Sequence, residues 1–183
     1  MMVSGLTWAR RHKREFEAVI TIEDPRITQF GSGNRSLRFH RDARPEHLVL
    51  SFYDLDEPIP APYYQPWMRL ADYADVAAAL AFARQRESLL VHCHAGVSRS
   101  TAIALAILTE QLGEPQAAMA MLLKLRPIAV PNRHVTLIAD ELLGCQGKLI
   151  ATMDAWDQST RGNATRRRLC RIAHFVEFGV PFM

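Results

Sequence analysis

A cysteine and an arginine, separated by five residues, lie between two apolar runs of the sequence. Cys93 follows residues 89–91, Leu-Leu-Val, and Arg99 precedes residues 102–108, which are all Ala, Ile or Leu. The first run predicts a buried strand and the second a helix, so the segment between them is a short loop at a helix start. Unpaired amides and the dipole of a helix start bind tetrahedral oxyanions. The pattern therefore predicts a phosphate-binding loop, whose amides belong to His94, Ala95, Gly96, Val97, Ser98 and Arg99.

Each polar residue of this stretch has an expected task. Cys93 is the candidate nucleophile, because helix-start amides and Arg99 favour the thiolate, which is the form that attacks. The planar guanidinium of Arg99 can hold two phosphoryl oxygens into the transition state, which a lysine cannot do. Gly96 suits a tight backbone path with positive φ. We expect Ser100 to stabilise the sulfur as a leaving group, and His92 to orient the loop by hydrogen bonding.

Residues 92–100, His-Cys-His-Ala-Gly-Val-Ser-Arg-Ser, resemble the signature of the Cys-based protein tyrosine phosphatase superfamily, which is His-Cys, five residues, Arg, then Ser or Thr. The ending Ala-Gly-Val-Ser-Arg-Ser is similar to the dual-specificity branch. Residues 126–132 resemble the Arg-Pro…Pro-Asn segment that follows the signature in those phosphatases, and residues 50–56 resemble the strand and loop that carry their general acid. The resemblance covers about residues 17–143.

The resemblance implies a metal-independent and cofactor-independent phosphatase that hydrolyses phosphomonoesters through a cysteinyl-phosphate. Phosphotyrosine in a protein substrate is the first expectation, with phosphoserine and phosphothreonine next, because His94, Ala95 and Val97 lack the lysines that suit a highly charged inositide. Arg126 and Asn132 are expected to support the loop. Two other classes stay open: a non-catalytic phosphate-binding module, and a sulfurtransferase, which also uses a loop cysteine at a strand–helix junction.

The general acid has three candidates. Breaking the P–O bond requires a proton donor, and a carboxylic acid on a loop is the expected source. Asp54 fits best, because the acid of the resembled family follows its strand immediately. The proline-rich stretch after Glu57 separates this loop from Cys93 by a long distance in sequence, so Asp56 and Asp72, the latter at a predicted helix start, remain alternatives.

Strands and helices alternate along the chain. Strands are predicted over residues 18–22, 48–52 and 89–92, and helices over residues 67–84, 99–111, 115–124 and 133–143, with Gly113 and Gly144 as helix stops. A polar segment at residues 31–35 and four prolines, Pro58, Pro60, Pro62 and Pro66, interrupt this pattern. The alternation predicts an α/β fold, a mainly parallel central sheet flanked by helices, with the ligand at the carboxyl end of a strand.

The composition of the chain argues against a disulfide-rich, a membrane-spanning and a nucleic-acid-binding protein. The 183 residues are 49% hydrophobic and 22% charged, enough for one core without disulfides or metals. Three widely spaced cysteines favour a reducing compartment, so we expect a cytoplasmic protein. No apolar run approaches the roughly 20 residues of a membrane span. A net charge of +3 is too small to indicate nucleic-acid binding.

Two basic clusters lie near the ends of the chain. Residues 161–183 hold five arginines against one glutamate, together with scattered large apolar residues. We therefore divide the chain into a catalytic domain, residues 1–150, and a basic tail, residues 151–183, which forms an amphipathic helix or is poorly ordered and offers a weak contact for an anionic membrane or a partner. Residues 10–14 are interpreted as a solvated lead-in to the first strand. The sequence leaves the oligomeric state open.

Overall fold

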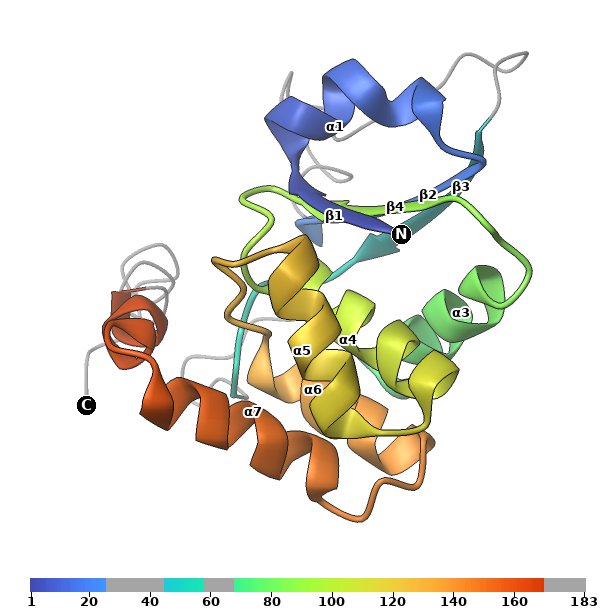
Figure 1. The fold of residues 1–183 in the computed structure, drawn as a ribbon. Helices are drawn as coiled ribbons and strands as arrows, with labels where there is room; N and C mark the ends of the chain where they lie inside the picture. The colour runs from blue at the N-terminus through green and yellow to red at the C-terminus, as the bar shows by residue number, and fades with distance from the viewer. Residues whose placement is uncertain (26–44, 58–67, 170–183) are drawn as a thin grey trace.

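The computed structural model of the chain describes residues 1–25, 45–57 and 68–169 (Figure 1). Three features expected from the sequence lie outside these residues: the polar segment at residues 31–35, the four prolines between residues 58 and 66, and the basic tail from residue 170 onward. The described elements are β1 (Met2–Gly5), α1 (Leu6–His12), the 3-10 turn η1 (Lys13–Glu15), β2 (Ala18–Glu23), β3 (Glu46–Ser51), α3 (Tyr73–Ala83), β4 (Leu89–Cys93), α4 (Arg99–Leu112), α5 (Pro115–Leu125), α6 (Arg133–Leu142) and α7 (Lys148–Ser159).

The four described strands form one parallel sheet in the order β1-β4-β2-β3. The predicted α/β fold class is confirmed. In Figure 1, α1 covers one face of the sheet, while α3, α4, α5 and α6 lie on the other. β4 is an inner strand, with Gly5 of β1 paired to Cys93 on one side and Thr21 of β2 paired to His92 on the other. Cys93 therefore leaves the sheet from its interior.

The helix that follows Cys93 is the centre of the helical layer. Every residue of α4 from Arg99 to Thr109 is buried, because α3, α5 and α6 all pack against it. The helix ends at Gly113, whose φ of 69° lies in the left-handed region, as the sequence predicted. A helix start held in this way by its neighbours is a fixed platform for a loop.

The packed unit continues past the division expected at residue 150. That position falls inside α7, where Leu149 and Met153 are both fully buried against the core. Asp140 of α6 holds the beginning of α7, since its carboxylate accepts hydrogen bonds from the N–H groups of Gly147, Leu149 and Ile150 at 2.7, 2.8 and 3.3 Å. Residues 163–169 are helical as well. At least the first part of the expected tail is thus folded.

One strand was not expected, and one helix begins later than expected. The strand expected as the first, residues 18–22, corresponds to β2, and the basic cluster at residues 10–14 precedes it on α1 and η1, while β1 comes before both. The helix expected from residue 67 begins at Tyr73, because Asp72 caps it: Asp72 Oδ1 accepts from the Asp75 N–H, and Asp75 Oδ2 accepts from the Asp72 N–H, both at 3.0 Å. Within the described residues, each helix is too short or too polar to cross a bilayer.

Candidate active site

The sulfur of Cys93 lies at the carboxyl end of β4, between the sheet and the start of α4. The residue is 3% exposed. The Gly96 N–H donates a hydrogen bond to Sγ at 3.2 Å, and the Ser100 hydroxyl lies 3.3 Å from Sγ. Both groups can donate to a thiolate, and the hydroxyl stands where it can stabilise sulfur as a leaving group. The structure thus brings Cys93, Gly96 and Ser100 together.

The loop from Cys93 to Arg99, called the nucleophile loop below, packs closely against β1. Gly96 has a φ of 71°, and a Cβ at this position would lie 2.3 Å from the carbonyl carbon of Ser4 and 2.4 Å from the nitrogen of Gly5. Only glycine fits this path. The Leu6 N–H donates to the His94 carbonyl at 2.9 Å, which fixes the beginning of the loop to the beginning of α1. β1 is therefore a support of the loop as well as an edge of the sheet.

The carbonyl groups of the loop point outward to donors from elsewhere in the chain. Arg126 donates from Nε to the Gly96 carbonyl at 2.8 Å and from Nη2 to the Ala95 carbonyl at 3.3 Å. The Val130 N–H donates to the Val97 carbonyl at 2.8 Å. The C=O and N–H groups of a trans peptide point in opposite directions. The amides of these peptides consequently face the interior of the loop, where an oxyanion would be bound.

Arg99 is buried, and one of its nitrogens is anchored. Its Nη1 donates to Asp24 Oδ1 at 2.7 Å and to the Phe52 carbonyl at 2.8 Å. Neither Nε nor Nη2 donates a hydrogen bond within the described part of the chain, although Nε is fully buried. Burial opposes the charge of Arg99, but the carboxylates of Asp54 and Asp24 outweigh it and raise the pKa of the guanidinium above its usual value. A charged pair of donors is therefore left for two oxygens of a ligand.

Asp54 is the acid that reaches this loop. Its Oδ1 accepts from the Ser98 hydroxyl at 2.6 Å and from Asn132 Nδ2 at 2.9 Å. Its Oδ2 lies 3.8 Å from Arg99 Nε and accepts no hydrogen bond from the described residues. With Oδ1 occupied by two donors, Oδ2 is the oxygen on which a transferable proton would reside. Asn132 also donates to the Leu55 carbonyl at 3.2 Å, so it holds the acid and its neighbour together.

The two alternative acids lie in other surroundings. Asp56 accepts from the Arg133 N–H at 2.6 Å and pairs with Arg167 at 3.3 Å, so both of its oxygens have partners outside the nucleophile loop. Asp72 caps α3, and the hydrogen bond from the Asp75 N–H, joined by the charge of Arg69, holds the pKa of its carboxyl below the usual value. An acid with a lowered pKa is a poor store of a proton near neutrality. Of the three candidates, Asp54 alone contacts this loop, through Ser98 and Arg99.

No family model matches the chain, and no curated protein matches it. Solved structures do match. The human tyrosine phosphatase-like serine/threonine/tyrosine-interacting protein aligns with a TM-score of 0.54 and 19% identity, over 77% of this chain and 83% of its own. PTPMT1 in complex with PI(5)P gives 0.55 and 20%, over 78% and 87%. Human DUSP28 gives 0.54 and 16%, over 79% and 88%. The fold is that of the dual-specificity phosphatases.

In this phosphatase fold, His92 supports the loop from inside the sheet. Its Nε2 lies 2.7 Å from the Thr21 hydroxyl, and its Nδ1 lies 3.3 Å from the Cys93 carbonyl. A carbonyl only accepts, so Nδ1 carries the proton and Nε2 accepts from Thr21. Burial lowers the pKa of His92 to about 4. The imidazole is therefore neutral near neutral pH, which suits a positioning role and excludes one as a cation.

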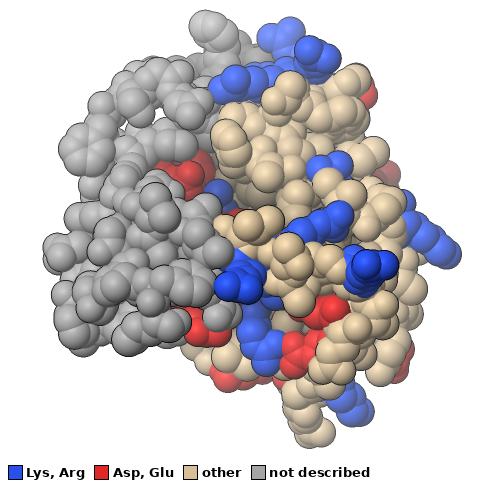
Figure 2. All heavy atoms as spheres, turned by 90° about the vertical axis from the view of Figure 1, so that its left-hand side faces the viewer, with Lys and Arg blue, Asp and Glu red and all other residues tan. Residues whose placement is uncertain are grey.

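Two contributors to the site lie outside the motifs noted in the sequence. β1 has only four residues, so no periodic pattern marks it. Asp24 immediately follows the buried strand β2, and the carboxyl ends of parallel strands meet at one edge of a sheet. The position of Asp24 directly after a buried strand could therefore have predicted that it lies near Arg99. On the face shown in Figure 2, basic and acidic side chains are mixed among the described residues.

Proposed function

We propose that this protein is a cysteine-dependent phosphatase acting on phosphomonoesters. The observation that carries the proposal is the set of groups around the nucleophile loop: the sulfur of Cys93, the unoccupied donors of Arg99 and the available Oδ2 of Asp54. A nucleophile, an oxyanion clamp and a proton donor are the three functions that phosphoryl transfer requires. The dual-specificity phosphatase fold supports this proposal.

In the first step, the thiolate of Cys93 attacks phosphorus in line with the ester oxygen. The S–P bond forms as the P–O bond breaks, and Oδ2 of Asp54 gives its proton to the departing oxygen. Nε and Nη2 of Arg99, with the inward amides of the loop, bind the equatorial oxygens while charge accumulates on them. The Ser98 and Asn132 hydrogen bonds to Oδ1 keep the acid aimed at the loop.

In the second step, water hydrolyses the cysteinyl-phosphate. Asp54, now a carboxylate, removes a proton from the water as its oxygen bonds to phosphorus. The S–P bond breaks and returns the electron pair to sulfur, where the Ser100 hydroxyl and the Gly96 N–H donate to the regenerated thiolate. Inorganic phosphate then leaves. No metal ion or cofactor takes part in this proposal.

We propose a phosphorylated protein as the substrate, with phosphotyrosine first. The phosphatase fold also accepts phosphoinositides, since a PTPMT1 structure contains PI(5)P. Here the exposed loop positions are His94 and Ala95, which provide no lysine or arginine for additional phosphates. One phosphate with a neutral leaving group fits this loop better than a polyphosphorylated ring.

The test uses purified protein, an aryl phosphate and EDTA. We expect the wild type to release phosphate, and we expect Cys93→Ser to abolish turnover while still binding inorganic tungstate, because serine keeps the shape of the loop but is a far poorer nucleophile. Tungstate binding by the wild type without turnover would instead identify a phosphate-binding module. Turnover of thiosulfate in place of the phosphate ester would identify a sulfurtransferase.

A further inference from the structure

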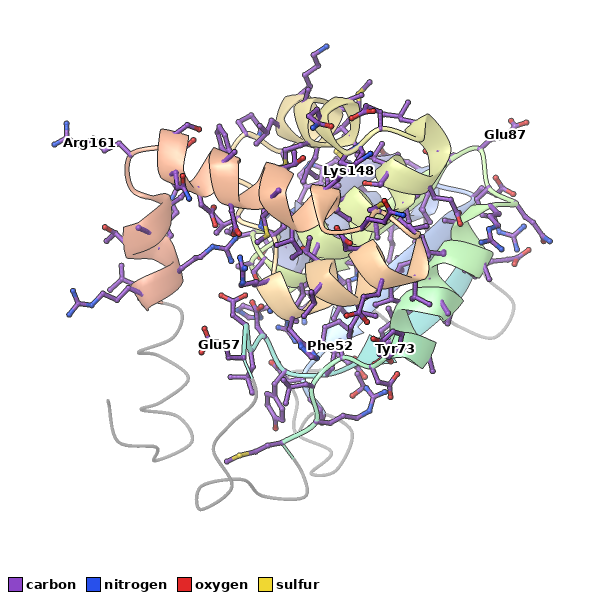
Figure 3. The ribbon with its side chains drawn as sticks, turned by 90° about the horizontal axis from the view of Figure 1, so that it is seen from below. Phe52, Glu57, Tyr73, Glu87, Lys148 and Arg161 are labelled. Carbon is purple, nitrogen blue, oxygen red and sulfur yellow. The ribbon has the colours of Figure 1, made fainter. Side chains whose placement is uncertain are left out.

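One arginine of the basic C-terminal segment points into the protein. Arg167 lies in the helical residues 163–169, and its side chain is 16% exposed. Its neighbours Arg166 and Arg168 are both exposed. In Figure 3, the described residues that follow Arg161 lie on the same side of the molecule as Glu57. A largely buried arginine requires hydrogen-bond or charge partners, whereas its exposed neighbours are solvated by water.

The guanidinium of Arg167 joins three separate parts of the chain. Nη1 lies 3.4 and 3.3 Å from the two carboxylate oxygens of Asp56, in the loop after β3. Nη2 donates to the Pro131 carbonyl at 2.9 Å, in the turn before α6, and Nε donates to the carboxylate of Asp157 in α7. Two carboxylates therefore meet at one cation. Without that cation, both negative charges would remain in a half-buried space.

The residues that Arg167 contacts are neighbours in sequence of Asp54, the proposed acid, and of Asn132, which binds it. Asp56 is two residues from Asp54, and the Arg133 N–H donates to Asp56 Oδ1 at 2.6 Å. Asn132 donates to Asp54 Oδ1 and to the Leu55 carbonyl. Residues 132 and 133 thus donate a hydrogen bond to each of residues 54, 55 and 56. Arg167 binds both segments, through the Pro131 carbonyl and the carboxylate of Asp56.

We infer that Arg167 is a positioning residue for general-acid catalysis: it fastens the loop after β3 so that Oδ2 of Asp54 meets the leaving oxygen. This inference rests on the proposed function. Proton transfer requires hydrogen-bond distance, so a loop displaced by about 1 Å loses much of the benefit. A segment at the far end of the chain thereby acts on the chemistry without touching the substrate.

The experiment compares Arg167→Ala with Arg168→Ala, which removes the same charge from the next residue of the same helix. Phenyl phosphate needs a protonated leaving group, whereas 2,4-dinitrophenyl phosphate does not. We expect Arg167→Ala to lower kcat on phenyl phosphate by about tenfold or more, with less than about a threefold loss on the dinitrophenyl ester and KM little changed. Arg168→Ala should resemble the wild type on both esters. Arg167→Lys should recover part of the loss, because an ammonium can pair with Asp56 but cannot span all three partners.

A double-mutant cycle with Asp56→Asn shows whether the effect passes through this carboxylate. We expect the double variant to lose little more than Arg167→Ala alone. Equal losses on both esters, or fully additive losses in the cycle, would overturn the inference.

Amide hydrogen exchange separates this inference from the proposed function. Exchange at residues 53–57 should increase in Arg167→Ala and not in Arg168→Ala, whether or not the protein turns over an ester. If the wild type hydrolyses neither ester, the proposed function fails and the inference about catalysis fails with it. If the wild type is active and the exchange of residues 53–57 is the same in both variants, the inference fails alone.

Discussion

Lowering the pH should protonate His92, and protonation should destabilise the fold. The imidazole is fully buried, donates to the Cys93 carbonyl and accepts from the Thr21 hydroxyl. Burial lowers its pKa from 6.5 to about 4. Between these two values the unfolded chain binds a proton that the folded chain does not, so the free energy of unfolding falls as the pH falls through this window. Above the unfolded value, His92 contributes no pH dependence.

The pKa shift of His92 determines how much the free energy of unfolding falls. The difference between 6.5 and about 4 corresponds to about 3 kcal/mol when the window is crossed completely. Between about pH 7.5 and about pH 5, the loss attributable to His92 is about 2 kcal/mol. His92→Gln removes the titrating group and keeps an oxygen that can accept from Thr21. We therefore expect this variant to be less stable than the wild type at the higher pH, with the gap narrowing by about 2 kcal/mol at the lower one.

Urea unfolding followed by circular dichroism at the two pH values measures that gap. The matched control is His94→Gln, which removes an exposed imidazole two residues along the chain. This variant gives the baseline for removing a histidine from the loop, because the His94 side chain lies at the surface. A His92→Gln gap that stays constant within about 0.5 kcal/mol would refute the assignment of His92 as a buried neutral hydrogen-bonding group.

Three further substitutions test the acid, the clamp and the scaffold. Asp54→Asn should lower kcat on phenyl phosphate by about 100-fold and much less on a nitrophenyl ester, and Glu57→Gln in the same loop should not distinguish the two esters. Asp24→Asn should lower kcat/KM by about tenfold in a steady-state assay, because Arg99 loses a charged anchor. Asp140→Ala should reduce the free energy of unfolding by about 3 kcal/mol in urea, since three N–H groups at the start of α7 lose their acceptor, while kcat per folded molecule stays unchanged.

The central half of the fold could be predicted because its signals are local. The apolar runs before Cys93 and after Arg99 correspond to β4 and α4, whose start at Arg99 agrees with the expected residue. The helices α5 and α6 begin at the expected Pro115 and Arg133, where a proline at the first turn and an Asn132 cap mark the boundaries. Caps, prolines and glycines act within a few residues, so the sequence alone displays them.

The partners of the site could not be predicted in the same way. Asp24 meets Arg99 across 75 residues, and Arg167 meets Asp56 across 111. Charge alone does not distinguish a buried acid from the exposed ones, because burial is decided by the packing of elements distant in sequence. The choice among Asp54 and its two rivals was open for the same reason: only the positions of Ser98 and Asn132 in space single out one carboxylate.

Two supports that the sequence did not reveal lie outside the stretch that resembles the phosphatases, one on each side of it. β1 precedes the stretch of about residues 17–143 that resembles the phosphatases, and Arg167 follows it. β1 presses on the loop of the nucleophile through Gly96, and Arg167 fastens the loop of the proposed acid through Asp56. The reacting groups and their supports thus belong to different parts of the chain. Comparing signature residues alone would retain the proposed nucleophile, clamp and acid, and it would omit both of the supports that contact their loops.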